Sequence, residues 1–166
     1  MLKNSEFVSK LRNSGLRPTK QRLKICEVLF NRDKTFHFTI NDLAKNISEN
    51  FNEKISLATI YNTVHAFKDK GYLKEITISS DKSYFDTNIT KHHHFYDEDT
   101  NLLIDCNDNE IGKVNIKNNI TGKKISSVEV LVRVASDTQN QNLKKTFFLN
   151  LYYNHSKLLT FSLELL

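Results

Sequence analysis

The chain has 166 residues and a net charge of +5, and its basic charge lies in the first half: residues 1–74 carry 14 Lys/Arg against 7 Asp/Glu, whereas residues 75–166 carry 10 against 12. This asymmetry favours a nucleic-acid partner for the first half. Cys26 and Cys106 form no C-x-x-C pair, and no uncharged apolar run reaches the ~18–20 residues that span a bilayer, so we expect a soluble, cytoplasmic protein with neither a disulfide framework nor a membrane partner.

Residues 5–31 predict two helices. An apolar stripe over residues 5–14 marks the first helix, and Gly15 after it can adopt the left-handed conformation that ends a helix. Pro18 favours the start of a second helix, because a proline in the first turn removes no intrahelical hydrogen bond. A second apolar stripe extends this helix over about residues 18–31.

Two further helices carry N-cap signals. Thr39, with Asp42 three residues later, predicts a capping box at the start of a third helix. Ser56 is the predicted cap of a fourth helix, in which apolar residues recur at i, i+4 and i+7 and which Gly71 ends. Residues 73–85 then alternate as the strands of a β-hairpin do. Helices with short connections followed by a hairpin predict a winged helix-turn-helix, with the hairpin as its wing.

The outward face of the fourth helix has the chemistry to read DNA. Tyr61 and Thr59 offer a hydroxyl and apolar surface to a thymine, Asn62 can address adenine, and Lys68 can contact a phosphate. An ordinary amphipathic helix would also show a polar face here, but the helical context and the basic residues upstream favour DNA. The predicted DNA-binding residues are Arg17, Lys20, Arg22, Ser56, Thr59, Tyr61, Asn62 and Lys68.

The residues beyond 87 predict a small α/β unit. Two short strands are expected at residues 94–96 and 102–104, and alternating valines predict a longer strand over residues 125–134. Residues 109–119 fit only a poor helix, because they contain a glycine and are rich in Asn and β-branched residues. A unit of this size has little core of its own, so we expect a homodimer formed through its sheet and helix.

The predicted fold class is therefore α+β, in three parts. Residues 1–86 are expected to form an N-terminal winged helix-turn-helix domain that binds DNA. Residues 87–135 are expected to form a small C-terminal α/β domain for dimerisation and effector binding. Residues 136–166 form a tail with several aromatic residues, for which an amphipathic helix and an irregular appendage both fit the sequence.

Three consecutive histidines, His92, His93 and His94, carry the clearest functional signal. Their internal position, with Asp86 and further acidic residues close by, argues against a purification tag. Neutral imidazole binds Zn, Fe, Cu and Ni, and a nearby carboxylate can complete a coordination shell or orient a ring. On a strand, His92 and His94 would point to one face and His93 to the other. Because the triplet follows the predicted DNA-binding helix and wing, it suggests a metal- or haem-responsive transcription factor.

Three segments resemble the Fur superfamily of metalloregulators: Gly-Leu-Arg-Pro-Thr-Lys-Gln-Arg at 15–22, Leu-Ala-Thr-Ile-Tyr-Asn-Thr-Val at 57–64 and His-His-His-Phe-Tyr at 92–96. The triplet with Phe-Tyr-Asp-Glu-Asp after it, and Ile-Ser-Ser-Val-Glu-Val-Leu-Val-Arg-Val at 125–134, look most like the iron response regulator branch. The resemblance covers about residues 10–134. It implies a dimeric winged-helix repressor or activator of iron homeostasis, whose affinity for a double-stranded DNA operator depends on iron status, sensed through haem in this branch.

The resemblance also implies a sensory metal site that joins the two domains. Matched residue by residue, it falls on His37 at the start of the third helix, on Asp86 after the wing, and on His92 and His94 of the triplet. Three imidazoles and one carboxylate suit Zn(II), Fe(II) or Mn(II). Without the resemblance, His37 would be interpreted as an ordinary loop histidine.

Other family features are altered in this sequence. The cysteine pair that holds structural zinc in many relatives falls on Asp97 and Thr100, which cannot form a thiolate site. A second family site beside the triplet is depleted: its first histidine falls on Lys91, its aspartate on His93 and its helix glutamate near Gly112. His93 is then available as a haem ligand, and the haem candidates are residues 92–94.

Three functions fit these observations. The leading hypothesis is a DNA-binding regulator of iron homeostasis gated by haem or a divalent metal, and its closest alternative is a repressor that senses Fe(II), Mn(II) or Zn(II) directly, without haem. A metal-dependent hydrolase is the enzyme alternative. Hydrolysis needs an open coordination position, which four protein ligands would close, and the sequence shows no Ser or Cys nucleophile constellation. We therefore expect a regulator and not an enzyme.

Overall fold

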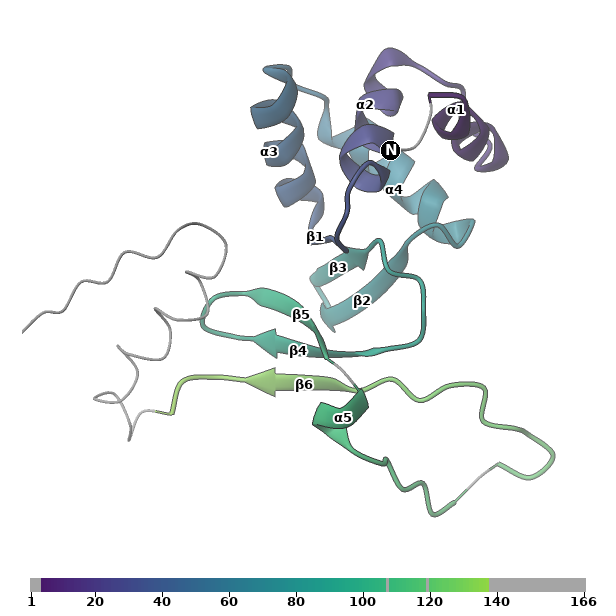
Figure 1. Ribbon diagram of the computed structural model, residues 1–166, viewed down its shortest axis with the longest axis vertical. Helices are drawn as coiled ribbons and strands as arrows, with labels where there is room; N and C mark the ends of the chain where they lie inside the picture. The colour runs from purple at the N-terminus through teal and green to yellow at the C-terminus, as the bar shows by residue number, and fades with distance from the viewer. Residues whose placement is uncertain (1–3, 107, 119, 138–166) are drawn as a thin grey trace, which may run out of the picture.

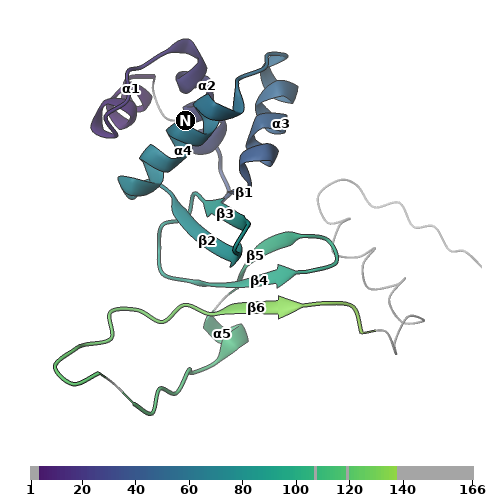
Figure 2. The same cartoon turned by 180° about the vertical axis from the view of Figure 1, so that it is seen from behind.

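The computed structural model describes residues 4–106, 108–118 and 120–137, and its fold is α+β, as predicted (Figure 1). Four helices lie on one side of a three-stranded sheet, and a second three-stranded sheet lies beyond it (Figure 2). The elements in chain order are α1 (Asn4–Asn13), α2 (Lys20–Phe30), β1 (His37–Phe38), α3 (Ile40–Phe51), α4 (Leu57–Asp69), β2 (Lys74–Ser79), β3 (Lys82–Asp86), β4 (His93–Asp97), β5 (Leu102–Cys106), α5 (Asp108–Ile111) and β6 (Leu131–Val134). No helix in the described ranges is long and apolar enough to cross a membrane.

Hydroxyl caps set the starts of three helices. Thr39 accepts a hydrogen bond from the Asp42 N–H (3.2 Å) and donates its own N–H to the Asp42 carboxylate (3.0 Å), so the predicted capping box is confirmed. Ser56 caps α4 by accepting from the Thr59 N–H, also as predicted. The second helix begins at Lys20 and not at residue 18, because Thr19 takes the N-cap position.

The four helices share one apolar core. Leu11, Leu29, Leu43, Ile60 and Phe67, from the four helices, have at most 1% of their surface exposed. Removing such side chains from water provides most of the driving force for packing the helices. The core also includes Phe38 of β1 and Phe85 of β3, which ties the helices to the first sheet.

The first sheet has the order β1-β3-β2 and includes a strand that the sequence did not predict. Strands β2 and β3 form the expected wing hairpin over residues 74–86. Strand β1 has only two residues and pairs antiparallel with β3, so that the Cα atom of His37 lies opposite that of Asp86. His37 therefore lies on a strand before α3, and not at the start of that helix. This pairing brings the first two candidate ligands together.

The second sheet has the order β5-β4-β6, with β4 antiparallel to β5 and parallel to β6. The two short strands predicted from the sequence are confirmed as β4 and β5. The strand predicted over 125–134 is limited to Leu131–Val134, the residues whose register pairs with His94 to Asp97 of β4. The poor helix expected at 109–119 is a single turn, Asp108–Ile111.

One face of the second sheet packs against the wing. Ile78 and Tyr84 of the wing contact Tyr96 and Leu103 of β4 and β5 in a small buried cluster. Lys82, which opens β3, donates a hydrogen bond to the Tyr96 hydroxyl (2.9 Å). Described residues of the predicted tail end at Asp137, so most of that prediction lies outside the described residues.

Candidate metal centre

Strand pairing positions five candidate ligands at the junction of the two sheets. The β1–β3 pair places His37 beside Asp86, and the β4–β5 pair places His94 opposite Asp105. His92, just before β4, projects to the same side as His94 because alternate residues of an extended chain share a face. The four predicted ligands are therefore adjacent, and Asp105 joins them.

The five ligand atoms converge on one point and lie within 4.8 Å of one another. The His37 Nε2 atom is 2.8 Å from Asp105 Oδ1 and 3.4 Å from Asp86 Oδ2. The His92 Nε2 atom is 3.0 Å from each of those oxygens and 2.9 Å from His94 Nε2. Three imidazole nitrogens and two carboxylate oxygens at such separations form a suitable shell for one divalent cation.

Burial supports a ligand role for these side chains. The Asp86 side chain is fully buried, and His94 is only 4% exposed. His37 Nε2, Asp86 Oδ2 and Asp105 Oδ1 are buried without a partner in hydrogen-bond geometry, although each lies within ion-pair distance of another ligand. Buried polar atoms without partners are costly, and a cation between them would satisfy all three.

The charges of the site are coupled. Burial raises the pKa of the Asp86 carboxyl, but the nearby His37 and His94 rings and the Asn88 N–H outweigh burial and hold this pKa well below its usual value. Burial lowers the pKa of His37, but attraction to the nearby carboxylates of Asp86 and Asp105 outweighs burial and raises the pKa above 6.5. Before a metal binds, the site therefore favours ionised Asp86 and protonated His37.

Two backbone contacts orient the ligand atoms. The Asn88 N–H donates to Asp86 Oδ1 (2.7 Å), which leaves Oδ2 directed at the cluster. The His92 Nδ1 atom is 2.9 Å from the Thr90 carbonyl, which can only accept, so Nδ1 carries the proton and the Nε2 lone pair faces the other ligands. Such outer contacts fix the tautomer and geometry of metal ligands. The residues present therefore fit a divalent metal ion.

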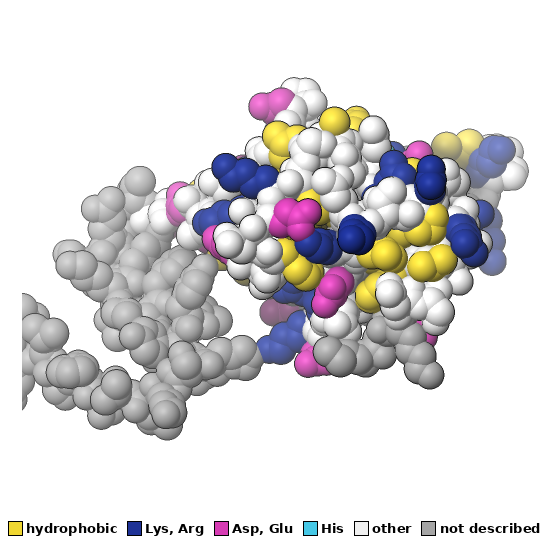
Figure 3. Space-filling model, turned by 90° about the horizontal axis from the view of Figure 1, so that it is seen from above, with side chains coloured by type: hydrophobic (Ala, Val, Ile, Leu, Met, Phe, Trp, Pro, Cys, Tyr) yellow, Lys and Arg dark blue, Asp and Glu magenta, His cyan; other side chains and the backbone are white. Residues whose placement is uncertain are grey.

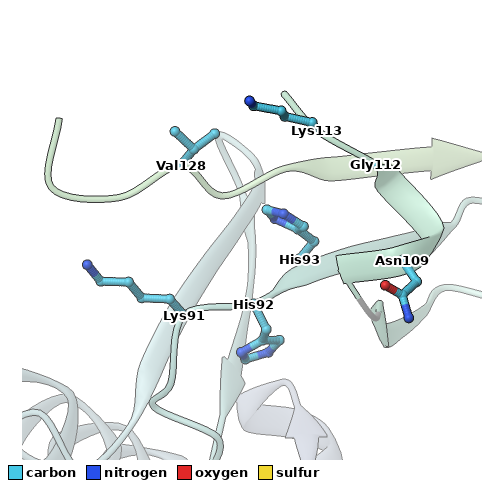
Figure 4. A pocket seen from close by; sticks show the side chains of 7 residues that line it. All are labelled: Lys91, His92, His93, Asn109, Gly112, Lys113 and Val128. Carbon is cyan, nitrogen blue, oxygen red and sulfur yellow. The ribbon is translucent and has the colours of Figure 1, made fainter. Parts of the chain in front are cut away.

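His93 lies on the opposite face of β4, as the alternation predicted. Its Nδ1 atom accepts a hydrogen bond from the Val130 N–H (3.1 Å). Figure 4 shows that His93 and His92 project to opposite sides of the chain. His93 lines a pocket together with Lys91, His92, Asn109, Gly112, Lys113 and Val128.

Where many relatives hold structural zinc with cysteines, this chain has a hydrogen-bonded turn that contains Asp97 and Thr100. Asp97 Oδ1 accepts the backbone N–H groups of Asp99 (2.9 Å) and Thr100 (3.3 Å), which forms a turn held by hydrogen bonds. Cys26 is buried in the helical core, where loss of hydration raises the pKa of its thiol to about 12. A protonated thiol of this kind is no metal ligand.

Asp105 is the candidate ligand that the sequence alone did not reveal. It follows the predicted strand 102–104 and keeps the alternation of Leu103, so it faces the same side as His94 across the β4–β5 pair. That antiparallel register was the available signal. An acidic residue at the end of a strand paired with the histidine triplet is a ligand candidate on geometry alone.

The predicted DNA-binding residues occupy the helical part. Tyr61, 52% exposed, and Asn62 project outward from α4, and the Tyr61 ring lies 4.0 Å from the His65 ring. Lys68, at the far end of α4, forms ion pairs with Asp69 (3.3 Å) and Glu75 (3.4 Å), so it is less available to a phosphate than the sequence suggested.

Residues before α4 complete the predicted set. Arg17 and Lys20 are exposed, and Arg22 donates a hydrogen bond to the Arg17 carbonyl (2.8 Å). The hydroxyls of Ser56 and Thr59 are hydrogen-bonded to each other (2.9 Å) at the start of α4. Seen from above the helices, Lys and Arg side chains are spread over several places on the surface (Figure 3).

Comparisons with known proteins agree with this architecture. The model of the Ferric uptake regulator family matches residues 13–133. The Peroxide-responsive repressor PerR of Staphylococcus aureus (strain Mu50 / ATCC 700699) is 36% identical over 100 residues, which cover 60% of this chain and 66% of that protein. The match thus spans just under two thirds of the length of the curated relative.

Solved structures show the same fold. The ferric uptake regulator from Pseudomonas aeruginosa with manganese has a TM-score of 0.57 at 24% identity, covering 82% of this chain and 99% of that one. The Vibrio cholerae ferric uptake regulator has a TM-score of 0.58 at 24% identity, covering 78% and 98%. A zinc-bound manganese uptake regulator has a TM-score of 0.55 at 18% identity, covering 79% and 98%. Because the family model matches most of its length, the chain belongs to the Ferric uptake regulator family.

Proposed function

We propose that the protein is a metal-responsive, DNA-binding transcription regulator of iron homeostasis, acting as a cytoplasmic homodimer. The observation that carries this proposal is the cluster of His37, Asp86, His92, His94 and Asp105, because its members come from both sheets. A cation bound there would favour one arrangement of the helical part relative to the second sheet. A ligand that binds one arrangement better than another shifts the population, which is how metal would control DNA affinity.

The effector that these ligands fit best is a divalent metal sensed directly. Mixed nitrogen and oxygen donors suit Fe(II), Mn(II) and Zn(II). Manganese and zinc appear in the descriptions of the solved relatives, which supports metal binding here without identifying the ion. The regulator function, as opposed to a metal-dependent hydrolase, is supported by family membership.

The DNA partner is supported by the helical part. Tyr61 and Asn62 offer a mostly exposed reading face on α4, and Arg17 and Lys20 offer exposed positive charge. In a winged helix-turn-helix the recognition helix enters the major groove. We propose that α4 is that helix and that the partner is a double-stranded operator.

The homodimer is supported by an apolar face of the second sheet. Ile104 (51% exposed), Leu102 (39%) and Val134 (41%) project from the face opposite the wing. Phe95 and Val132 are register neighbours on that face and are half-buried. Pairing of this face with a second copy would remove these side chains from water.

Haem is the alternative effector, and the resemblance to the iron response regulator branch supports it. His92 and His94 direct their Nε2 atoms into the metal cluster, whereas His93 projects to the opposite face of β4, where its Nδ1 atom accepts the Val130 N–H. Axial ligation by His93 would therefore leave the five metal ligands in place. His93→Ala separates the two effectors, because it removes this haem ligand and spares the cluster.

A peroxide response is a second candidate, supported by the name of the Staphylococcus aureus relatives. It requires the same metal cluster, so it adds a signal to the proposed regulator and does not replace it. Adding hydrogen peroxide to the metal-loaded protein bound to its operator tests it. Loss of DNA binding that requires a redox-active ion would support the candidate.

The main proposal is tested by selecting an operator from random-sequence DNA with metal-loaded protein. The dissociation constant of that operator is then measured for the metal-free protein and for protein loaded with Mn(II), Fe(II) or Zn(II). We expect metal to change operator affinity by about 5–150-fold, the usual range of allosteric coupling. The His92→Ala/His94→Ala variant should show no metal effect. An operator affinity that is the same with and without every metal would contradict the proposal.

A further inference from the structure

The two carboxylates of the cluster are held in different ways. Asp86 is fully buried, and its Oδ1 atom is fixed by the Asn88 backbone N–H. The Asp105 side chain is 34% exposed, and its Oδ2 atom accepts a hydrogen bond from the Thr35 hydroxyl (3.2 Å). The oxygen of Asp86 that faces away from the cluster is thus held by backbone, whereas the corresponding oxygen of Asp105 is held by the Thr35 side chain.

The residue that follows Thr35 is tied to the first sheet. Its neighbour Phe36 donates its N–H to the Thr87 hydroxyl (2.8 Å) and accepts the Thr87 N–H at its carbonyl (3.3 Å). Thr87 directly follows Asp86, so these contacts extend the β1–β3 pairing to the residue beside Thr35. Thr35 therefore directly precedes a backbone segment that is bonded to the end of β3, and its hydroxyl reaches Asp105 of β5.

From this geometry we propose that Thr35 is a positioning residue that recruits Asp105 as the fifth metal ligand and thereby sets the metal preference of the site. The inference rests on the proposed metal-sensing function. By holding Oδ2, the Thr35 hydroxyl leaves Oδ1 alone to face His37 and His92, at 2.8 Å and 3.0 Å. Asp105 then acts as a ligand through one oxygen.

The fifth ligand should matter more for the binding of Mn(II) than for that of Zn(II). Three imidazoles and Asp86 alone would make a four-ligand site, which suits the tetrahedral preference of Zn(II). Mn(II) binds a site of nitrogen and oxygen ligands more weakly than Zn(II) and favours oxygen donors, so it depends more on a second carboxylate. Without the Thr35 hydroxyl, the partly exposed Asp105 carboxylate can turn toward water. Loss of this contact should thus weaken Mn(II) binding more than Zn(II) binding.

The test compares the Thr35→Val and Thr35→Ser variants of the full chain with the unmodified protein. Valine keeps the shape of threonine without the hydroxyl, and serine keeps the hydroxyl. Thr35 is exposed, so neither change disturbs the core. The dissociation constant of Mn(II) is measured from the electron paramagnetic resonance signal of the free ion, and that of Zn(II) by competition with a chromogenic chelator.

We expect Thr35→Val to raise the Mn(II) dissociation constant by about 10–100-fold, the usual effect of losing an outer-shell contact, and that of Zn(II) by less than about threefold. Thr35→Ser should restore the Mn(II) value. An equal weakening for both ions, or no change for either, would overturn the role of Thr35 while leaving the metal sensor intact. Failure of the unmodified protein to bind either ion would instead contradict the proposed function.

Discussion

The five candidate metal ligands differ in how firmly each side chain is held in the metal-free site. Asp86 and His94 are almost completely buried, whereas a third of the Asp105 side chain is exposed. Ligands fixed in advance lose little conformational freedom when the ion binds. Asp86 and His94 therefore form the rigid part of the site, and Asp105 with its Thr35 contact forms the adjustable part.

The first prediction at the residue scale concerns the histidine triplet. His92→Ala/His94→Ala should abolish the binding of one divalent ion per subunit, because it removes two of the five converging ligands. The matched control is His93→Ala, in which the histidine lost lies on the opposite face of β4. Metal content after dialysis measures the result. Undiminished metal in the double variant would move the site elsewhere.

The second prediction concerns how pH changes the stability of the fold, first without metal and then with it. The stabilisation from His37, whose pKa is raised, is complete below its unfolded value of 6.5 and is lost as pH rises through the folded value. The stabilisation from Asp86, whose pKa is lowered, is present above its unfolded value of 3.8 and is lost as pH falls toward the folded value. The metal-free pair therefore stabilises the fold most between these two unfolded values.

Metal binding follows the opposite trend at His37, because a metal ligand must be the neutral imidazole. We expect added Mn(II) to raise the melting temperature more at about pH 8 than at about pH 5.5, where His37 is protonated. Thermal unfolding with and without metal at both pH values measures this. An equal effect of metal at both pH values would contradict the coupling.

At the scale of elements, α4 has a capped start, a buried face and an exposed face. Ser56 caps its start, Ile60 and Phe67 are buried in the core, and Tyr61 is mostly exposed. Substitutions on the outer face should therefore alter DNA binding without unfolding the helix. The wing contacts the second sheet through Tyr84 and Tyr96, so its position depends on the sheet that carries two of the metal ligands.

Tyr61→Ala should weaken specific operator binding by about 1–3 kcal/mol and leave most nonspecific binding intact, because the lost contact is to a base. Lys20→Ala is the comparison, since loss of a phosphate contact lowers both affinities and reduces their salt dependence. Titrations with operator and with unrelated DNA at several salt concentrations give the ratio of specific to nonspecific affinity for each variant, and its salt dependence. An unchanged ratio of specific to nonspecific affinity in Tyr61→Ala would exclude a base contact.

At the scale of the whole molecule, the exposed face of the second sheet supports a dimer. Ile104→Lys places a charge at the centre of that face and should yield monomers, because a lone charge buried in an apolar interface is strongly unfavourable. Ile89→Lys is the control, since Ile89 is 58% exposed on the loop between β3 and β4. Sedimentation equilibrium gives the mass of each. A dimer that survives Ile104→Lys would place the interface elsewhere.

The features predicted correctly from the sequence are those set by local interactions. The capping box at Thr39, the Ser56 cap, the ends near Gly15 and Gly71, and the wing hairpin each depend on residues only a few positions apart. The opposite orientations of His92 and His93 follow from backbone alternation alone. The assignment to the iron response regulator branch stays a prediction, as do the predicted domain boundaries.

Only the tertiary structure decided the features that depend on distant backbone pairing. Strand β1 exists because β3, more than forty residues later, offers it hydrogen bonds, and the same pairing sets His37 beside Asp86. Strand β6 is shorter than its valine pattern because β4 pairs with only four of its residues. Asp105 joins the candidate metal ligands because its strand pairs with the histidine triplet. Two-residue periodicity in the sequence fixes which face a side chain occupies, but strand register fixes what it meets there.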